Sequence, residues 1–201
     1  MVPGVGGHLM AHAFLEQELL PLLLNTDREA IAAASTRIGR WWRRVERLLG
    51  PASGARAVGD VAVTPLLEAL GHGRVALAPQ AWGLLGMVGP QPGPAAVLLV
   101  LPWSARLDAA WREALRGGLA ADARWAVVCN GRGLALADCT RPWARRWVEF
   151  EFDQLMRDAR GPAVLWALAG AAALAAPNGG GTRTLAALVS RSEQHAASVC
   201  H

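Results

Sequence analysis

Arginines at helical spacing are the residues whose types and positions first suggest a chemical role for this chain. Four of them recur every three or four residues: Arg37, Arg40, Arg44 and Arg47. On a helix this spacing places their guanidinium groups in one basic stripe. Such a stripe can contact the phosphates of a nucleic acid, and the neighbouring Trp42 can stack on a base or lie against protein. The alternative is an ordinary solvated helix face, whose arginines pair with Glu46 and other acids.

A second basic cluster lies farther along the chain, after a turn signal. Arginines and tryptophans are interleaved there: Arg141, Trp143, Arg145, Arg146 and Trp147. Arg132 lies before this cluster in the run Asn130-Gly131-Arg132, which is interpreted as a turn first and as a candidate contact second. Binding contacts concentrate in loops, although the tryptophans can equally anchor the loop to the core. The two clusters together predict the candidate nucleic-acid-binding residues, which are Arg37, Arg40, Arg44, Arg47, Arg132, Arg141 and Arg145.

Residues that would bind a metal or attack a substrate do not form a complete set. His8 and His12 have the spacing of a metal pair on a helix, but no third ligand is apparent. Glu149, Glu151 and Asp153 are interpreted as an exposed ion-pair surface beside the arginines that precede them. No Ser-His-Asp arrangement can be argued. We therefore predict no metal, no cofactor and no catalytic residue.

Composition limits the class of protein. The chain has 201 residues, all twenty of its basic residues are arginine, and its net charge of +4 permits nucleic-acid contact without requiring it. Three cysteines without a Cys-x-x-Cys pair disfavour a disulfide framework and a zinc site, and they fit a reducing, cytoplasmic setting. We expect Cys129 to be a buried strand residue. The amino terminus lacks a signal-peptide pattern, and the most apolar run, Pro162 to Ala176, is too short for a membrane span and predicts a buried helix.

Apolar periodicity predicts a helical amino-terminal segment over residues 1–73. Its helices are expected over 8–24, 27–49 and 53–70, with Pro65 kinking or dividing the third. The second helix carries the arginine stripe and begins at Asp27 as its N-cap. Its apolar face is predicted to comprise Ile31, Ala34, Ile38, Trp41, Val45 and Leu48.

An α/β core is predicted over residues 74–160. Strands are expected over 74–78, 82–88, 95–101, 125–129, 134–137 and 146–152. The run 95–101 is apolar throughout, which is typical of a strand covered on both faces. Ser104 is expected to cap a helix ending at Gly117-Gly118, so that strands 95–101 and 125–129 pair in parallel. Asn130-Gly131 then supplies a two-residue hairpin turn.

The remaining residues, 161–201, are predicted to form a helical carboxy-terminal segment. A loop is expected over 177–181 and a final helix from Thr182. The fold class expected from these elements is α/β, with a mixed central sheet flanked by helices and helical extensions at both ends. The three segments are expected to form one compact domain.

Two runs of the sequence carry a family likeness. From Trp125 the chain combines a strand, an Asn130-Gly131-Arg132 turn, a short strand, and a strand ending in Glu151-Phe152-Asp153 before a helix. Residues 65–71 read Pro-Leu-Leu-Glu-Ala-Leu-Gly. This order resembles the amino-terminal region of type IIG and type I-like restriction-modification enzymes, where a restriction-endonuclease-like domain precedes a DNA adenine methyltransferase. The resemblance implies a restriction-endonuclease-like fold.

The catalytic residues of that family have no counterpart in this chain. Such a nuclease holds an acid on one strand and Asp/Glu-x-Lys on the next, because two carboxylates bind the metal and the Lys steadies the attacking water. Here residues 97–101 read Val-Leu-Leu-Val-Leu, and no lysine occurs anywhere. Glu68 matches a helix-borne acid of the family, but a solvated helix acid is the other interpretation. The resemblance therefore implies a nuclease-like fold with a degenerate nuclease motif.

Three functions follow as expectations. The first is a non-catalytic, DNA-associated module of a restriction-modification or anti-phage defence methyltransferase system, with DNA and a linked or separate methyltransferase subunit as partners and no membrane. The second is an interaction scaffold that docks a methyltransferase or another defence subunit through its apolar terminal helices and its tryptophans. The third, disfavoured by the missing lysine, is an active metal-dependent endonuclease.

Overall fold

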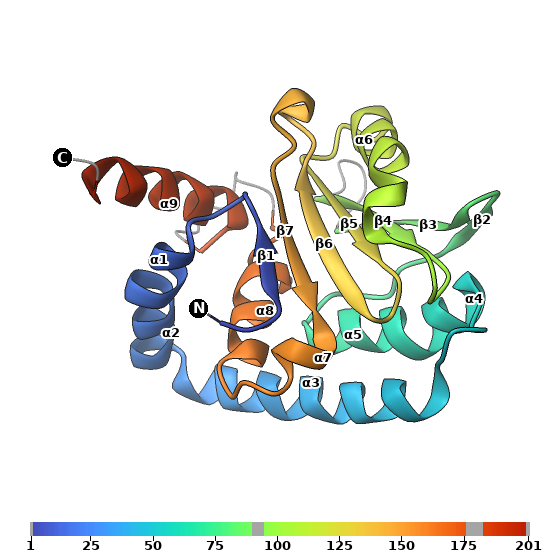
Figure 1. Ribbon diagram of the computed structural model, residues 1–201, viewed down its shortest axis with the longest axis horizontal. Helices are drawn as coiled ribbons and strands as arrows, with labels where there is room; N and C mark the ends of the chain where they lie inside the picture. Colours follow the sequence, from blue (N-terminus) through green and yellow to red (C-terminus); the bar gives the residue numbers. More distant parts are fainter. Residues whose placement is uncertain (1, 90–94, 176–182, 200–201) are drawn as a thin grey trace.

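In the computed structural model, which describes residues 2–89, 95–175 and 183–199, seven strands form one open, mixed sheet (Figure 1). The strands are β1 (Val5–Gly7), β2 (Ala78–Gln80), β3 (Gly83–Val88), β4 (Ala96–Val100), β5 (Trp125–Cys129), β6 (Gly133–Asp138) and β7 (Trp147–Glu151). Their order across the sheet is β1-β7-β6-β5-β4-β3-β2. β4 and β5 pair in parallel, and every other pair is antiparallel. The predicted parallel pairing and the predicted hairpin are both confirmed.

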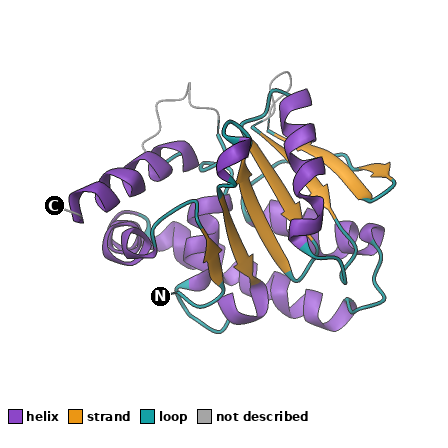
Figure 2. Cartoon of the chain, turned by 45° about the horizontal axis from the view of Figure 1, so that its top comes forward, coloured by secondary structure: helices purple, strands orange, loops and turns teal. Residues whose placement is uncertain are grey.

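Helices pack against the sheet, and further helices lie near both ends of the chain (Figure 2). The α-helices are α1 (His12–Phe14), α2 (Leu20–Thr26), α3 (Arg28–Leu48), α4 (Ala55–Val58), α5 (Thr64–Ala69), α6 (Trp111–Ala120), α7 (Phe152–Leu155), α8 (Gly161–Ala169) and α9 (Leu185–Val199). Two π-helical turns, η1 (Leu15–Leu19) and η2 (Gly59–Val63), and two 3-10 turns, η3 (Leu107–Ala110) and η4 (Pro142–Ala144), lie between them. The chain is thus an α/β protein with a mixed sheet and flanking helices.

Both faces of the central strands are buried. Along β4, Leu98 and Val100 belong to the larger core, which also contains side chains from α3, α5, α8 and α9. Val97 and Leu99 point the other way, into a smaller core shared with α6. A strand covered on both faces loses the alternation of apolar and polar residues. This confirms the interpretation of the apolar run 95–101.

The second predicted helix is found as α3, which packs on α8 and α5. The residues of its predicted apolar face are buried, except that Leu48, the last residue of the helix, is 58% exposed. Asp27 occupies the N-cap position, but its carboxylate accepts hydrogen bonds from Thr26 and Arg183 instead of capping the helix. The predicted N-cap position of Asp27 is therefore confirmed, but its side chain does not cap the helix.

The amino-terminal segment is not entirely helical. The first predicted helix begins only at His12, because residues 5–7 form β1 and pair with β7. Gly4 and Gly7 have φ angles of +74° and +96°, a conformation that glycine adopts readily. A Cβ at Gly7 would also overlap the carbonyl oxygen of Trp147. The glycines therefore allow this end of the chain to lie against the sheet.

Several predicted ends of helices and strands differ from those in the structure. No strand forms over 74–77, and β2 begins at Ala78. Ser104 caps nothing, since η3 starts at Leu107 and α6 follows it. The third helix consists of α4, η2 and α5 in direct succession, and Pro65, the residue predicted to kink or divide it, occupies the first turn of α5. The apolar helix after 161 ends at Ala169, and the predicted loop 177–181 and Thr182 lie outside the described residues.

Gly117 and Gly118 lie within α6 and do not end it, contrary to the sequence prediction. A Cβ at Gly118 would overlap Sγ of the buried Cys139, whereas a Cβ at Gly117 would lie 3.7 Å from Cγ2 of Val97, an ordinary contact. Gly118 is therefore needed for the close approach of α6 to the end of β6.

This difference gives a matched pair of substitutions. Alanine in place of glycine inside a helix stabilises it by up to about 1 kcal/mol. We expect Gly117→Ala to raise the free energy of unfolding by that order and Gly118→Ala to lower it, because overlap with Cys139 outweighs the helical gain. Urea unfolding of both variants measures the two effects. Equal stabilisation by both would contradict the close approach.

The burial of Cys129 and Cys139 predicts how their thiol groups ionise and react. Burial raises the pKa of Cys129 to about 12 and, with the charge of Asp138, the pKa of Cys139 to about 11. Because folding raises both pKa values, the stabilisation gained by keeping these thiols neutral is present below the ordinary thiol pKa and is lost as pH rises toward those values. In a Cys200→Ser background, we expect both thiols to resist a disulfide reagent at pH 8 until urea unfolds the chain. Rapid labelling of the native protein would show that the thiols are accessible.

Candidate functional site

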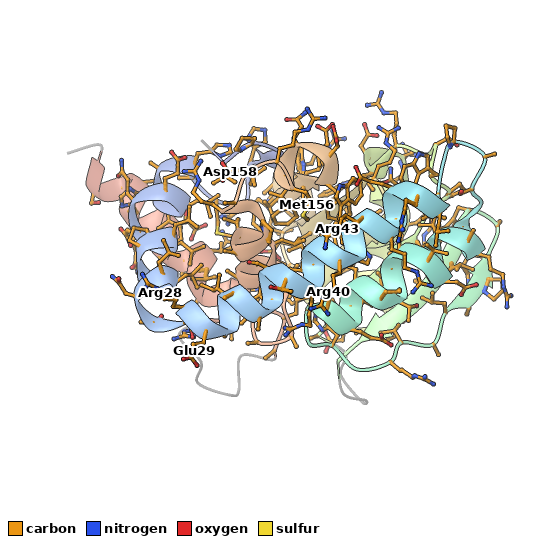
Figure 3. The ribbon with its side chains drawn as sticks, turned by 90° about the horizontal axis from the view of Figure 1, so that it is seen from below. Arg28, Glu29, Arg40, Arg43, Met156 and Asp158 are labelled. Atoms are coloured by element: carbon orange, nitrogen blue, oxygen red, sulfur yellow. The ribbon has the colours of Figure 1, made fainter. Side chains whose placement is uncertain are left out.

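The exposed side of α3 carries the first cluster of candidate residues. We call it the basic face, and it consists of Arg37, Arg40, Arg43, Arg44 and Arg47, all exposed. Figure 3 looks onto this helix, with Arg28, Arg40 and Arg43 along it. The predicted stripe is thus present on a surface helix. Arg43, which flanked the stripe in the sequence, belongs to the same surface.

Charge is concentrated on α3. The helix contains six of the twenty arginines and two of the sixteen acidic residues, so its net charge is +4. The whole chain also has a net charge of +4, which means that the remaining fourteen arginines and fourteen acids cancel. Between described residues, no arginine of α3 forms an ion pair. The expected alternative, a face whose arginines pair with acids such as Glu46, is not observed there.

Two members of the basic face also make hydrogen bonds within the fold. Arg37 Nε donates to the carbonyl oxygen of Ala69 at the end of α5, at 3.2 Å, and Arg47 Nε donates to that of Arg43, also at 3.2 Å. Cationic side chains near a helix carboxyl end satisfy carbonyls that lack a helical partner. Arg37 therefore also joins α3 to α5.

Trp42 lies against protein and is not available to a base. Its side chain is buried, with its ring centroid 5.7 Å from that of Phe152 and 5.8 Å from that of Trp41. Of the two roles expected for Trp42, the structure thus gives it the packing role.

Asn130 shapes the turn that positions Arg132. Its Oδ1 accepts hydrogen bonds from the backbone N–H groups of Arg132 and Gly133, both at 2.9 Å, and its Nδ2 donates to the carbonyl oxygen of Ala105 at 2.7 Å. Gly131 has a φ of +83°, so the turn needs a residue that tolerates this conformation. The central residues of the turn are Gly131 and Arg132, one position later than predicted. Arg132 is exposed at the tip.

The connection between β6 and β7 carries the rest of the second cluster and lies at the opposite end of the sheet from α3 (Figure 1). Arg141 and Arg145 are exposed, and Trp143 is 80% exposed. Arg146 is different, because it forms an ion pair with Glu193 of α9 and contacts the carbonyl oxygen of Leu9. The structure therefore separates these residues from the basic face and makes Arg146 a link within the fold.

A cleft of about 810 Å³ opens beside β6 and β7. One wall comes from η3 and the start of α6, and includes Arg106 and Arg112. The other wall comes from β7 and includes Glu149 and Glu151, while Arg132 and Arg145 are contributed by the two connecting loops. Two of the predicted residues, Arg132 and Arg145, thus border one cavity.

Charged side chains of both signs line the cleft. Arg106 forms two hydrogen bonds with Asp108, Nε to Oδ1 at 3.0 Å and Nη2 to Oδ2 at 2.6 Å. Across the cleft, the pKa of Glu149 is raised, chiefly by burial and also by the carboxylates of Asp108 and Glu151, against the opposing effects of a hydrogen bond with Trp147 and the charge of Arg106. Glu149 is not paired with Arg145 or Arg146 between described residues, so the predicted ion-pair surface is wrong for Glu149.

The metal and nuclease readings find no support in the described parts of the chain. No group of three or more His, Cys, Asp or Glu side chains there is arranged to hold a metal ion. His8 precedes α1, so it does not share a helix turn with His12, and its ring packs on Trp147 at 5.3 Å between centroids. β4 is apolar and fully buried, and Glu68 is exposed on α5.

The helices within the described ranges include none that is both long and apolar enough to cross a membrane. Comparisons with models of known protein families, with curated proteins and with solved structures found no match to this chain.

Proposed function

We propose that this chain is a non-catalytic, DNA-associated module of a restriction-modification or anti-phage methyltransferase system, with a nuclease-like fold. The observation that carries the proposal is the concentration of the chain's entire net positive charge on the exposed side of α3. The sequence resemblance supplies the rest: the restriction-endonuclease-like fold, the cytoplasmic defence setting, and a linked or separate DNA methyltransferase as partner. A mixed sheet with helices on both faces is compatible with that fold.

The geometry of the basic face suits a phosphate backbone. From Arg37 to Arg47 the helix rises by about 15 Å, and duplex DNA places a phosphate about every 3.4 Å of axis on each strand. Guanidinium groups pair with phosphates through two N–H groups at once. The five arginines of the basic face therefore match a short run of phosphates without reading bases. The module would position DNA, and it would leave chemistry to its partner.

The lack of cutting chemistry is part of the proposal. β4 contains only buried apolar residues where the family would place metal-binding acids, and the chain has no lysine. A single exposed carboxylate such as Glu68 binds Mg²⁺ poorly, because the ion keeps its water unless several oxygens replace it.

The alternative function, an interaction scaffold, is favoured by Trp143. This side chain is 80% exposed on the loop between β6 and β7, and tryptophan is a residue that often dominates binding energy at protein interfaces. The terminal helices, however, place Leu20, Leu23, Leu185 and Leu188 in the core. These four side chains are therefore not available to a partner, whereas Leu24 of α2 is 48% exposed.

Salt-dependent binding to duplex DNA tests the proposed function. Each phosphate contact contributes about 0.9 to the slope of log K against log salt. We expect the double substitution Arg40→Gln with Arg44→Gln to weaken binding and to reduce that slope by about 2. Fluorescence anisotropy with a labelled duplex at several salt concentrations measures both quantities.

The matched control is Arg74→Gln with Arg116→Gln, which removes the same charge from exposed positions outside α3. It should retain most of the affinity. Arg37 is unsuitable for this test because its removal also breaks the hydrogen bond to Ala69. Binding that is absent, or that falls equally in both double variants, would refute a DNA contact by α3. A complex with a methyltransferase subunit that survives high salt and is lost in Trp143→Ala would favour the scaffold.

A further inference from the structure

The cleft beside β6 and β7 lies where helices leave the sheet open. α6 contacts β4 and β5, and η3 contacts β5 and β6, while α6 reaches β7 through the packing of Trp111 on Trp147 at the start of that strand (Figure 2). The floor consists of small residues, including Gly133, Ala135 and Ala137. Small floor residues let the backbone of a bound segment approach closely. The volume of about 810 Å³ is in the range of cavities that bind ligands.

The charges of the cleft select the chemistry of its occupant. Arg106 is already neutralised by its two hydrogen bonds to Asp108. This leaves Arg112, Arg132 and Arg145 against Glu149 and Glu151 on β7. An occupant must therefore offer anionic groups to the arginines and cationic groups to the β7 wall at the same time.

A nucleic acid does not meet this requirement. Its backbone carries only negative charge, so a strand lying in the cleft would place phosphates beside Glu149 and Glu151. Glu149 lies near the carboxylates of Asp108 and Glu151, so a further negative charge beside it is costly. A polypeptide carries both signs of charge on side chains a few ångströms apart.

The dimensions also suit a polypeptide segment. β7 has five residues and spans about 17 Å, so an extended chain of about five residues matches its length. Trp147 of β7 packs edge-on against Trp111 of α6, with ring centroids 6.0 Å apart, and both border the cleft. These rings provide an apolar contact for one side chain of the segment.

We propose that this cleft binds an extended polypeptide segment of mixed charge, with its basic side chains on Glu149 and Glu151 and its acidic side chains on the arginines opposite. The proposal does not rest on DNA binding by α3, because the two surfaces share no residue.

The experiment uses four probes on the isotope-labelled full chain. They are a capped heptapeptide alternating Arg and Glu between alanines, the all-Arg and all-Glu versions of it, and a ten-nucleotide oligothymidylate. Chemical shifts of the indole N–H groups of Trp111 and Trp147 and of the backbone amide of Glu149 report on the cleft. We expect only the mixed-charge peptide to shift these signals to saturation with high occupancy.

A charge reversal sharpens the test. Glu149→Lys with Glu151→Lys, at exposed strand positions, leaves Asp108, which is paired with Arg106, as the remaining acid among the described lining residues. This variant should reduce binding of the mixed peptide at least tenfold while admitting oligothymidylate. The milder pair Glu149→Gln with Glu151→Gln should weaken peptide binding without admitting the oligonucleotide. Arg40→Gln with Arg44→Gln is the control, and it should leave the peptide-induced shifts unchanged. Oligothymidylate that shifts the cleft signals of the unmodified protein, or no saturable shift from any probe, would overturn the proposal.

Discussion

The packing of Phe152 against Trp41 and Trp42 is the contact on which the arrangement of both surfaces depends. Phe152 is completely buried, with its ring centroid 4.9 Å from that of Trp41 in an edge-to-face arrangement. It directly follows β7 and begins α7, so one side chain joins the sheet to α3. The indole N–H of Trp41 donates to the carbonyl oxygen of Ala62, at 2.7 Å, which fixes α3 against η2 as well. With two adjacent tryptophans turned inward, α3 cannot rotate about its axis, and its arginines must face water.

Helices cover the two faces of the sheet unequally. Long helices and large side chains fill one face, where the larger core collects residues from both ends of the chain, including Leu9, Ile38, Leu165 and Leu188. In the described part of the chain, the other face is covered by the short turn η3 and by α6, a helix of ten residues held close by Gly118. α6 covers the parallel pair in the middle and leaves the cleft open beside the antiparallel strands β6 and β7. The basic face and the cleft therefore arise on different elements for different reasons.

The sequence predicted the elements that depend on the pattern of neighbouring residues. The spacing of Ile31, Ile38 and Val45 was enough to define α3 and its inner face, and the order of strand, helix and strand was enough for the parallel pairing. β1 was missed because three residues with two glycines become a strand only when β7 offers them a partner. Gly117-Gly118 was interpreted as a helix end because the reason for Gly118, its contact with Cys139, lies twenty-one residues away. The regular spacing of the arginines on α3 was enough to predict the basic face. Arg106, Asp108 and Arg112 were missed because only the folded sheet brings them opposite Glu149.

Because all basic residues of α3 are arginines, the charge of the basic face and the charge of the cleft should respond differently to pH. A guanidinium group keeps its proton throughout the range in which the fold survives, and it offers no amine for acylation. Whatever α3 attracts should therefore be attracted equally in mildly acidic and mildly alkaline solution. The cleft differs, because the raised pKa of Glu149 makes the charge of its β7 wall fall first as the solution is acidified. One chain thus combines a surface of constant charge with a cavity whose charge balance is adjustable.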